Sequence, residues 1–280
     1  CESPEKRSST NKFKPACITK MHLAPSSASA PSTPPTTQGF LLRGRVSYTQ
    51  FAQGYRTGLE PVLMAAAVNA RAGQTVLEIG CGAGAGLLCL MHRIPGLLTC
   101  GVEKDPQTAQ LARQNLLANA HPQATILTGS FPEDWPTDGT TELERFDHCM
   151  ANPPWHADNG AASAEPRRDL ARRLGQHTLR RWIEGCATVL RHKGSLTLAL
   201  PTSLMDQALV ALNAAGFGGS TLYPFWPKNG REARIMLVQA RLGVKSPARL
   251  LPGLTLHEAD GAFTPAARTV LEDGAPLGGF

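Results

Sequence analysis

The chain has 280 residues, of which 42% are hydrophobic and 18% charged, and its formal net charge is +6. These values suit a globular protein with one large α/β domain and some additions, and no apolar run approaches the roughly 18 residues of a membrane span. The seven cysteines form no C-x-x-C pair. We therefore expect reduced thiols, a cytoplasmic location, no metal and no membrane partner.

Residues 1–38 are rich in Ser, Thr, Pro and Ala and contain almost no large apolar residues. Such a segment buries too little apolar surface to offset the entropy of ordering, so it is predicted to be a disordered tail. Met21 lies within it and is a candidate for the natural start.

Residues 39–245 alternate between helical and β-rich segments and are predicted to form the main domain. Helices are expected at 60–70, where Pro61 stands in the first turn, and at 105–120. Strands are expected at 75–79, 98–103, 124–128, 146–151, 195–200, 220–225 and 234–240. This order predicts an α/β fold, a Rossmann-like, seven-stranded and mostly parallel sheet with helices on both faces. Residues 246–280 are expected to be a C-terminal extension that packs on this domain.

The strongest local signal is the run V-L-E-I-G-C-G-A-G-A-G, residues 76–86. A buried strand that carries Glu78 leads into a turn with glycines at 80, 82 and 84. Glycines allow tight backbone conformations and close approach of a ligand. The run does not fit the dinucleotide pattern G-x-G-x-x-G, because Ala85 occupies the place of the third glycine.

Glu103 ends the next predicted strand, about 23 residues after Gly80. An acid at this strand tip can accept hydrogen bonds from both hydroxyls of a ribose. The alternative is an ordinary surface carboxylate at a strand end. The glycine-rich turn favours the ribose role.

The segment M-A-N-P-P-W, residues 150–155, ends the fourth predicted strand in a stiff corner. It is either a turn or a site that grips a flat, nitrogen-bearing substrate. Residues 161–193 follow it with eight basic and three acidic side chains. A solvated helix face explains such a block, but its place beside a candidate site favours a polyanionic partner.

Taken together, the glycine loop, Glu103 and N-P-P-W resemble the class I S-adenosylmethionine-dependent methyltransferases. The segments 41–46, 54–68, 225–231 and 256–265 are similar to the bacterial tRNA (adenine-N6)-methyltransferases that act on valine tRNA. The resemblance covers about residue 40 to the end. It implies S-adenosyl-L-methionine as cofactor, bound by Glu78, Gly80, Gly82, Gly84, Glu103, Ser130, Phe131 and Asn152.

For catalysis, the resemblance implies that the Asn152 side-chain oxygen and the Pro153 carbonyl accept the two hydrogens of an adenine amino group. Pro153 and Pro154 stiffen the corner, and Trp155 offers a face on which the base stacks. Trp155 stands where tyrosine or phenylalanine is commoner. Ser130 stands where the family usually has an aspartate that reaches the adenine of the cofactor, with the Phe131 backbone N–H still available.

The expected substrate is tRNA, near the anticodon. Its contacts are expected from Trp155, Arg56, Arg167, Arg168, Arg172 and Arg173. Two other activities stay open, N5-methylation of a protein glutamine and N2-methylation of an rRNA guanine. A non-catalytic RNA-binding protein with the same fold is the third alternative. The oligomeric state is open, with a monomer slightly favoured.

Overall fold

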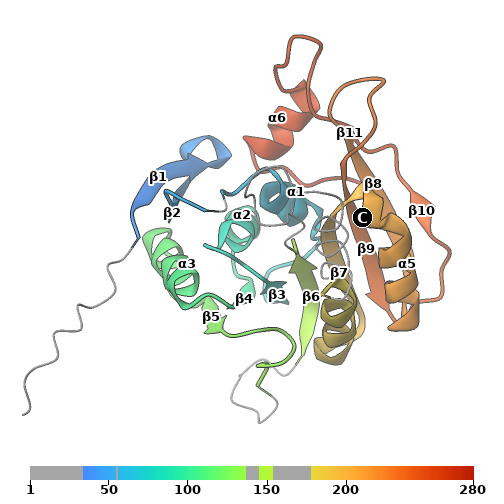
Figure 1. The fold of residues 1–280 in the computed structure, drawn as a ribbon, viewed down its shortest axis with the longest axis horizontal. Coiled ribbons are helices and arrows are strands. Elements are labelled where there is room, and N and C mark those ends of the chain that lie inside the picture. Colours follow the sequence, from blue (N-terminus) through green and yellow to red (C-terminus); the bar gives the residue numbers. More distant parts are fainter. Residues whose placement is uncertain (1–33, 55, 137–144, 154–177) are drawn as a thin grey trace, which may run out of the picture. The chain divides into compact units, whose positions relative to one another are not determined.

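A mostly parallel β-sheet runs through the centre of the chain (Figure 1). The computed structural model describes residues 34–54, 56–136, 145–153 and 178–280. The nine-stranded sheet has the order β10-β8-β9-β7-β6-β3-β4-β5, with β11 also paired to β8. Only β9 runs antiparallel to its neighbours among these described strands. The strands are β3 (Thr75–Ile79), β4 (Leu98–Glu103), β5 (Thr125–Thr128), β6 (Phe146–Ala151), β7 (Leu190–Pro201), β8 (Phe217–Trp226), β9 (Ile235–Leu242), β10 (Arg249–Leu250) and β11 (Leu254–Thr255).

The predicted α/β class is confirmed, and all seven predicted strands are present. The sheet has nine strands rather than seven because the short strands β10 and β11 pair with β8. These two strands have two residues each, too few for a period-two pattern to reveal them. Because β3 is paired parallel to both β4 and β6, the carboxyl ends of these three strands lie at the same edge of the sheet.

Helices cover both faces of the sheet (Figure 1). One face packs against α1, α2 and α3, and Val76 of β3 belongs to this apolar cluster. The other face packs against α5 and a helix over residues 178–189, and Leu77 and Ile79 belong to that cluster. This alternation is the period of two expected for a strand buried on both sides. The helices are α1 (Glu60–Ala67), α2 (Ala85–Arg93), α3 (Pro106–Ala118), α5 (Met205–Ala214) and α6 (Pro265–Leu271), with 3-10 turns η1 (Leu42–Gly44) and η2 (Thr202–Leu204). Within the described residues, no helix has the length and apolar character to cross a membrane.

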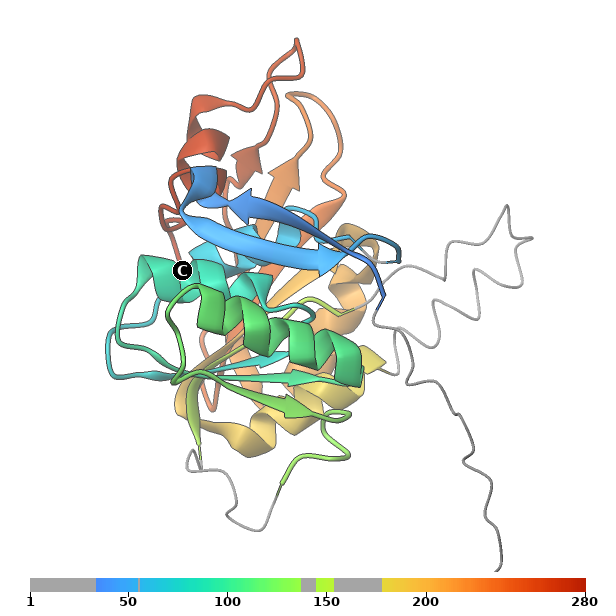
Figure 2. The same cartoon turned by 90° about the vertical axis from the view of Figure 1, so that its left-hand side faces the viewer.

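A β-hairpin precedes the main sheet and packs on α2 and α3 (Figure 2). It consists of β1 (Thr36–Leu41) and β2 (Val46–Phe51), paired antiparallel. Because β1 begins at Thr36, regular structure starts inside the segment 1–38 that the sequence predicts to be a tail. The small polar residues of β1 are exposed and gain their order from backbone pairing with β2, which composition does not reveal.

The C-terminal segment is joined to the main sheet and to α1. Besides the pairing of β10 and β11 with β8, the Leu277 N–H donates to the Ala66 carbonyl at 2.8 Å. The Trp226 indole N–H donates to the Pro252 carbonyl at 3.0 Å. Residues 246–280 therefore share the core of residues 39–245.

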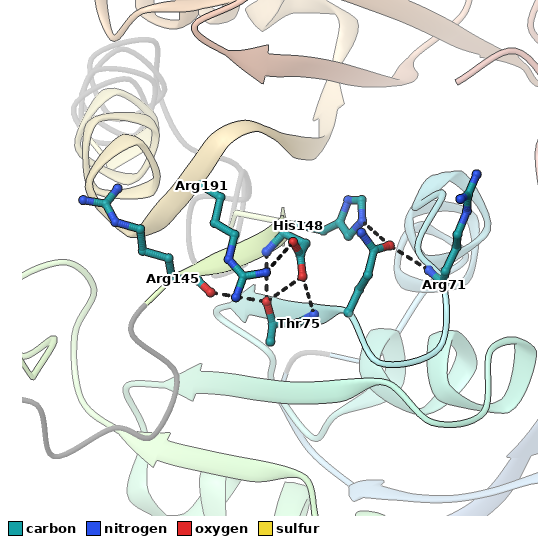
Figure 3. A network of polar contacts seen from close by, with 7 residues as sticks. Arg71, Thr75, Arg145, His148 and Arg191 are labelled. Carbon is teal, nitrogen blue, oxygen red and sulfur yellow. Dashed lines mark hydrogen bonds and ion pairs between the residues drawn. The ribbon is translucent and has the colours of Figure 1, made fainter.

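A network of polar side chains lies at the amino-terminal ends of β3 and β6 (Figure 3). Asp147 accepts hydrogen bonds from the Thr75 N–H at 2.9 Å and from Arg191 at 2.7 Å. His148 is buried beside them, with Nδ1 2.8 Å from the Ser195 hydroxyl and Nε2 3.2 Å from Gln74 Oε1.

The tautomer of His148 follows from its neighbours. Gln74 Oε1 also accepts the Arg71 N–H at 2.8 Å, which fixes this atom as an acceptor. Nε2 of His148 therefore carries the proton, and Nδ1 accepts from the Ser195 hydroxyl. Burial lowers the pKa of His148 to about 4, with the Arg241 charge acting in the same direction and the Asp147 charge opposing both.

We expect His148 to make the fold acid-sensitive. The unfolded chain takes up a proton at His148 near pH 6.5, whereas the folded chain does so only near its pKa of about 4. The contribution of neutral His148 to the free energy of unfolding is thus complete above pH 6.5 and is lost as the pH falls toward 4. The expected loss is about 2 kcal/mol between pH 7 and 4.5. Urea unfolding of the wild type and of His148→Gln at both pH values measures this loss. Equal losses in the two proteins would contradict the assignment.

Candidate active site

The glycine-rich turn leaves the carboxyl end of β3 and starts α2. Gly80, Gly82 and Gly84 have φ of 65°, 54° and 88°, in the left-handed region that side chains disfavour. The turn is closed by the Gly84 N–H, which donates to the Cys81 carbonyl at 2.9 Å. A Cβ at Gly82 would meet nothing within 4 Å, so space beside the turn is open at that residue.

Glu103 at the end of β4 holds this turn from the side. Its Oε2 accepts the Gly82 N–H and its Oε1 accepts the Asp105 N–H, both at 2.9 Å. The side chain is half-buried. Each carboxylate oxygen keeps further acceptor capacity, so the group can still receive a hydroxyl of a ligand. The sequence prediction of a ribose contact is compatible with this geometry and stays a prediction.

Glu78 lies beneath the turn. It is 3% exposed, and its Oε2 accepts the N–H of Leu87 in the first turn of α2 at 2.9 Å. A Cβ at Gly86 would come within 2.3 Å of Glu78 Oε1, so the carboxyl group packs on the helix backbone. Burial raises the pKa of Glu78 to about 8, the Leu87 N–H opposes the shift, and the Glu103 charge adds to it. Glu78, predicted to bind cofactor, therefore contacts the start of α2.

The segment after β5 contains an acid that sequence reasoning missed. The N–H of Ser130, the predicted neutral partner, donates to Asp134 Oδ2 at 2.8 Å. Asp134 thus brings a carboxylate to the place where the sequence offers only a hydroxyl. The Phe131 ring is buried and makes an edge-on contact with Trp135, so the predicted ligand contact at Phe131 could come only from its backbone.

The N-P-P-W corner begins next to the glycine turn. Ile79 and Ala151 are register partners in β3 and β6, so Gly80 and Asn152 leave adjacent strands at the same level. Asn152 is half-buried and Pro153 is buried. Pro154 and Trp155 lie outside the described residues. The same is true of the four arginines that are predicted to contact tRNA, Arg167, Arg168, Arg172 and Arg173.

Arg56 contacts the β1–β2 hairpin. Its Nη1 donates to the Thr37 hydroxyl at 2.9 Å, and the N–H of the next residue, Thr57, donates to Gln50 Oε1 at 3.0 Å. Arg56 is exposed. A role in binding substrate stays a prediction for this residue.

Trp182, from the helix over 178–189, is an aromatic residue at the site that sequence reasoning missed. A Cβ at Gly80 would lie 2.8 Å from Cη2 of Trp182, so the ring edge contacts the first glycine of the turn. The ring is half-buried and packs on the apolar cluster beneath the sheet. Its position in the sequence gives no signal beyond that of an aromatic residue in a helix.

Comparison with known proteins places these features in context. Residues 60–214 match the Methyltransferase small domain family. The chain is 25% identical over 211 residues to the tRNA1(Val) (adenine(37)-N6)-methyltransferase of Aeromonas hydrophila, covering 75% of this chain and 85% of the relative. It is 32% identical over 149 residues to the protein of the same name from Haemophilus influenzae, covering 52% of this chain and 61% of the relative.

A solved structure has the same fold. A predicted O-methyltransferase from Agrobacterium tumefaciens superposes with a TM-score of 0.63 at 22% identity. The match covers 78% of this chain and 97% of the other. At this identity the likeness concerns the fold alone.

Gly80 and Gly82 provide a matched pair of substitutions. Gly82→Ala adds backbone strain alone and should lower the free energy of unfolding by about 1 kcal/mol. Gly80→Ala adds the same strain and also overlaps the Trp182 ring, so its cost should be about 3 kcal/mol. In a Trp182→Leu background the excess should disappear. Chemical unfolding of the wild type, the three single variants and the Gly80→Ala/Trp182→Leu double variant measures this. A Gly80→Ala cost that is the same in both backgrounds would contradict the contact.

Proposed function

Since the chain belongs to the Methyltransferase small domain family, we propose that it methylates the exocyclic N6 of an adenosine in tRNA. It is an S-adenosyl-L-methionine-dependent enzyme. The observation that carries the proposal is the pairing of Ile79 with Ala151. Because of this pairing, the glycine turn lies beside Asn152. The turn lets a cofactor approach the backbone closely, and the Asn152 side-chain oxygen can accept a hydrogen bond from an amino group.

The residues around the turn fit the cofactor. The open space at Gly82 lets a ligand approach the backbone, and Glu103 is already oriented by two backbone N–H groups. We assign the ribose hydroxyls to Glu103 and the adenine side to Ser130, the Phe131 backbone and Asp134. Glu78 acts as a positioning residue that holds α2. When bound, the cofactor supplies an electrophilic methyl group on a sulfonium.

The target nitrogen needs acceptors more than a base. The lone pair of an adenine amino group is delocalised into the ring, which makes the nitrogen a poor nucleophile. Hydrogen bonds from its two hydrogens to the Asn152 side-chain oxygen and the Pro153 carbonyl favour the pyramidal nitrogen of the transition state. The two prolines fix the corner, so the acceptors need no reorganisation, and Trp155 stacks on the base. Once the nitrogen holds the methyl group, S-adenosylhomocysteine is the leaving group and one amino proton passes to solvent.

The names of the relatives favour tRNA over the alternatives. Both are called tRNA1(Val) (adenine(37)-N6)-methyltransferases, and neither name mentions a protein glutamine or an rRNA guanine. We therefore propose adenine 37 of valine tRNA as the target. This substrate implies a cytoplasmic enzyme, in agreement with the five free, buried cysteines of the described residues.

Replacement of Asn152 distinguishes a role in catalysis from a role in cofactor binding. Asn152→Ala should retain the fold and lose only the cofactor contact that the resemblance implies for Asn152, so S-adenosylhomocysteine should still bind within about tenfold of the wild-type affinity, because the turn and Glu103 are unchanged. Single-turnover methylation of valine tRNA should slow by about a hundredfold or more, since the lost acceptor acts mainly in the transition state. Rapid-quench assays with saturating labelled cofactor measure the rate. A variant that reacts at the wild-type rate would remove Asn152 from the catalytic role.

Arginines of the basic block are proposed to hold tRNA phosphates. Arg180 forms a 2.8 Å ion pair with Glu184 and Arg181 pairs with Glu133, so these two are already engaged. Arg167, Arg168, Arg172 and Arg173 are the better candidates. Replacing these four by glutamine should reduce the slope of log affinity against log salt by about three to four. Replacing Arg180 and Arg181 by glutamine is the control. Equal slopes in all proteins would show that the four arginines do not hold tRNA phosphates and belong to a solvated face.

A further inference from the structure

Two asparagines, one in α3 and one directly after it at the C-cap, form hydrogen bonds along the outer edge of β2. Asn115 accepts the Thr49 N–H at 3.0 Å and donates to the Thr49 carbonyl at 2.8 Å. Asn119 accepts the Ser47 N–H at 2.9 Å and donates to the Ser47 carbonyl at 2.7 Å. Both side chains thus pair with β2 as a neighbouring strand would.

The spacing of the two elements explains this match. Residues i and i+4 of a helix rise about 6 Å, and residues i and i+2 of a strand rise about 6.8 Å, so both pairs can form together. The asparagines also satisfy backbone groups that an edge strand would leave exposed. The contact joins residues more than 60 positions apart in the chain.

The second amide hydrogen distinguishes the two asparagines. In Asn119 it goes to the Asn115 carbonyl of the same helix, at 2.8 Å. In Asn115 it goes to the Ala83 carbonyl, at 2.9 Å. Ala83 lies between Gly82 and Gly84, so Asn115 bonds the hairpin and the glycine turn with one side chain. Asn115 is 2% exposed, and water cannot easily replace these bonds.

The hairpin in turn holds the segment that precedes α1. The Tyr48 hydroxyl lies 2.7 Å from the Thr57 hydroxyl, and Gln50 accepts the Thr57 N–H at 3.0 Å. The Asn115 hydrogen bonds, the backbone of β2 and the hydrogen bonds of Tyr48 and Gln50 therefore connect the glycine turn to Thr57.

We propose that Asn115 is a positioning residue that couples the β1–β2 hairpin to the glycine turn. The inference rests on the proposed function in that the turn is taken to bind S-adenosylmethionine. Coupling between two sites is reciprocal. Loss of the Asn115 bonds weakens cofactor binding, and bound cofactor stabilises the hairpin.

Asn119 supplies the matched control. Asn115→Ala and Asn119→Ala each remove two bonds to β2, but only the first removes the bond to Ala83. The Kd for S-adenosylhomocysteine, measured by calorimetry, should rise about tenfold in Asn115→Ala and less than about threefold in Asn119→Ala. Equal changes in the two variants, or no change in either, would overturn the coupling. Thermal unfolding of both variants verifies that each is folded at the assay temperature.

Hydrogen exchange of the wild-type chain gives a second test of the coupling, with Asn119→Ala as its control. Saturating S-adenosylhomocysteine should slow amide hydrogen exchange at Thr49 by about tenfold, and Asn119→Ala should retain this response. The Leu251 N–H, bonded to Leu222 at the opposite side of the sheet, is the internal control for general stabilisation. Tight binding with equal slowing at Thr49 and Leu251 would overturn the coupling alone. Absence of binding to the wild type would overturn the proposed function and the coupling together.

Discussion

The backbone N–H groups of the glycine turn and of α2 are held by two carboxyl groups, one on each side. Glu78 accepts from Leu87 below the turn, and Glu103 accepts from Gly82 beside it. The turn has no side chains of its own at its glycines, so these contacts and the Asn115 bond to Ala83 define its shape. The proposed cofactor site depends on this arrangement, because a ligand that approaches the glycine backbone would contact atoms whose positions are fixed by neighbouring residues.

The two carboxyl groups differ in burial, and burial raises the pKa of Glu78. The pKa of Glu78 is about 8, so near neutral pH this group is mostly protonated and can lie beneath the helix without a counterion. Glu103 is half-buried at the surface of the turn. Glu103 is therefore the carboxyl group of this pair that a ligand can reach, at the place proposed for the ribose hydroxyls. The contact with the turn and the contact with α2 are thus made by separate side chains.

Local sequence patterns predicted the parts of the fold that depend on local chemistry. The limits of β3, β4 and β6 agree with the predicted ones, because Gly80, Asp105 and Pro153 stop or follow each apolar run. β7 is longer than predicted, since it includes polar residues from Arg191 to Lys193 that give no apolar signal. The roles of Trp182, Asp134 and Asn115 depend on contacts between distant segments, and no local pattern contains that information. Glu78 illustrates the same limit, because its position in a strand gave no sign that it would bond to α2.

The central claim is that the glycine turn and the Asn152 corner together transfer a methyl group to an adenine of tRNA. The most direct measurement is incubation of total bacterial RNA, and of unmodified valine tRNA, with the protein and methyl-labelled S-adenosylmethionine, followed by nucleoside analysis. The account predicts label in N6-methyladenosine from tRNA, with none in valine tRNA whose adenine 37 is replaced by guanine. Label in N2-methylguanosine, label in protein glutamine when release factors are added, or no transfer to any RNA would contradict it.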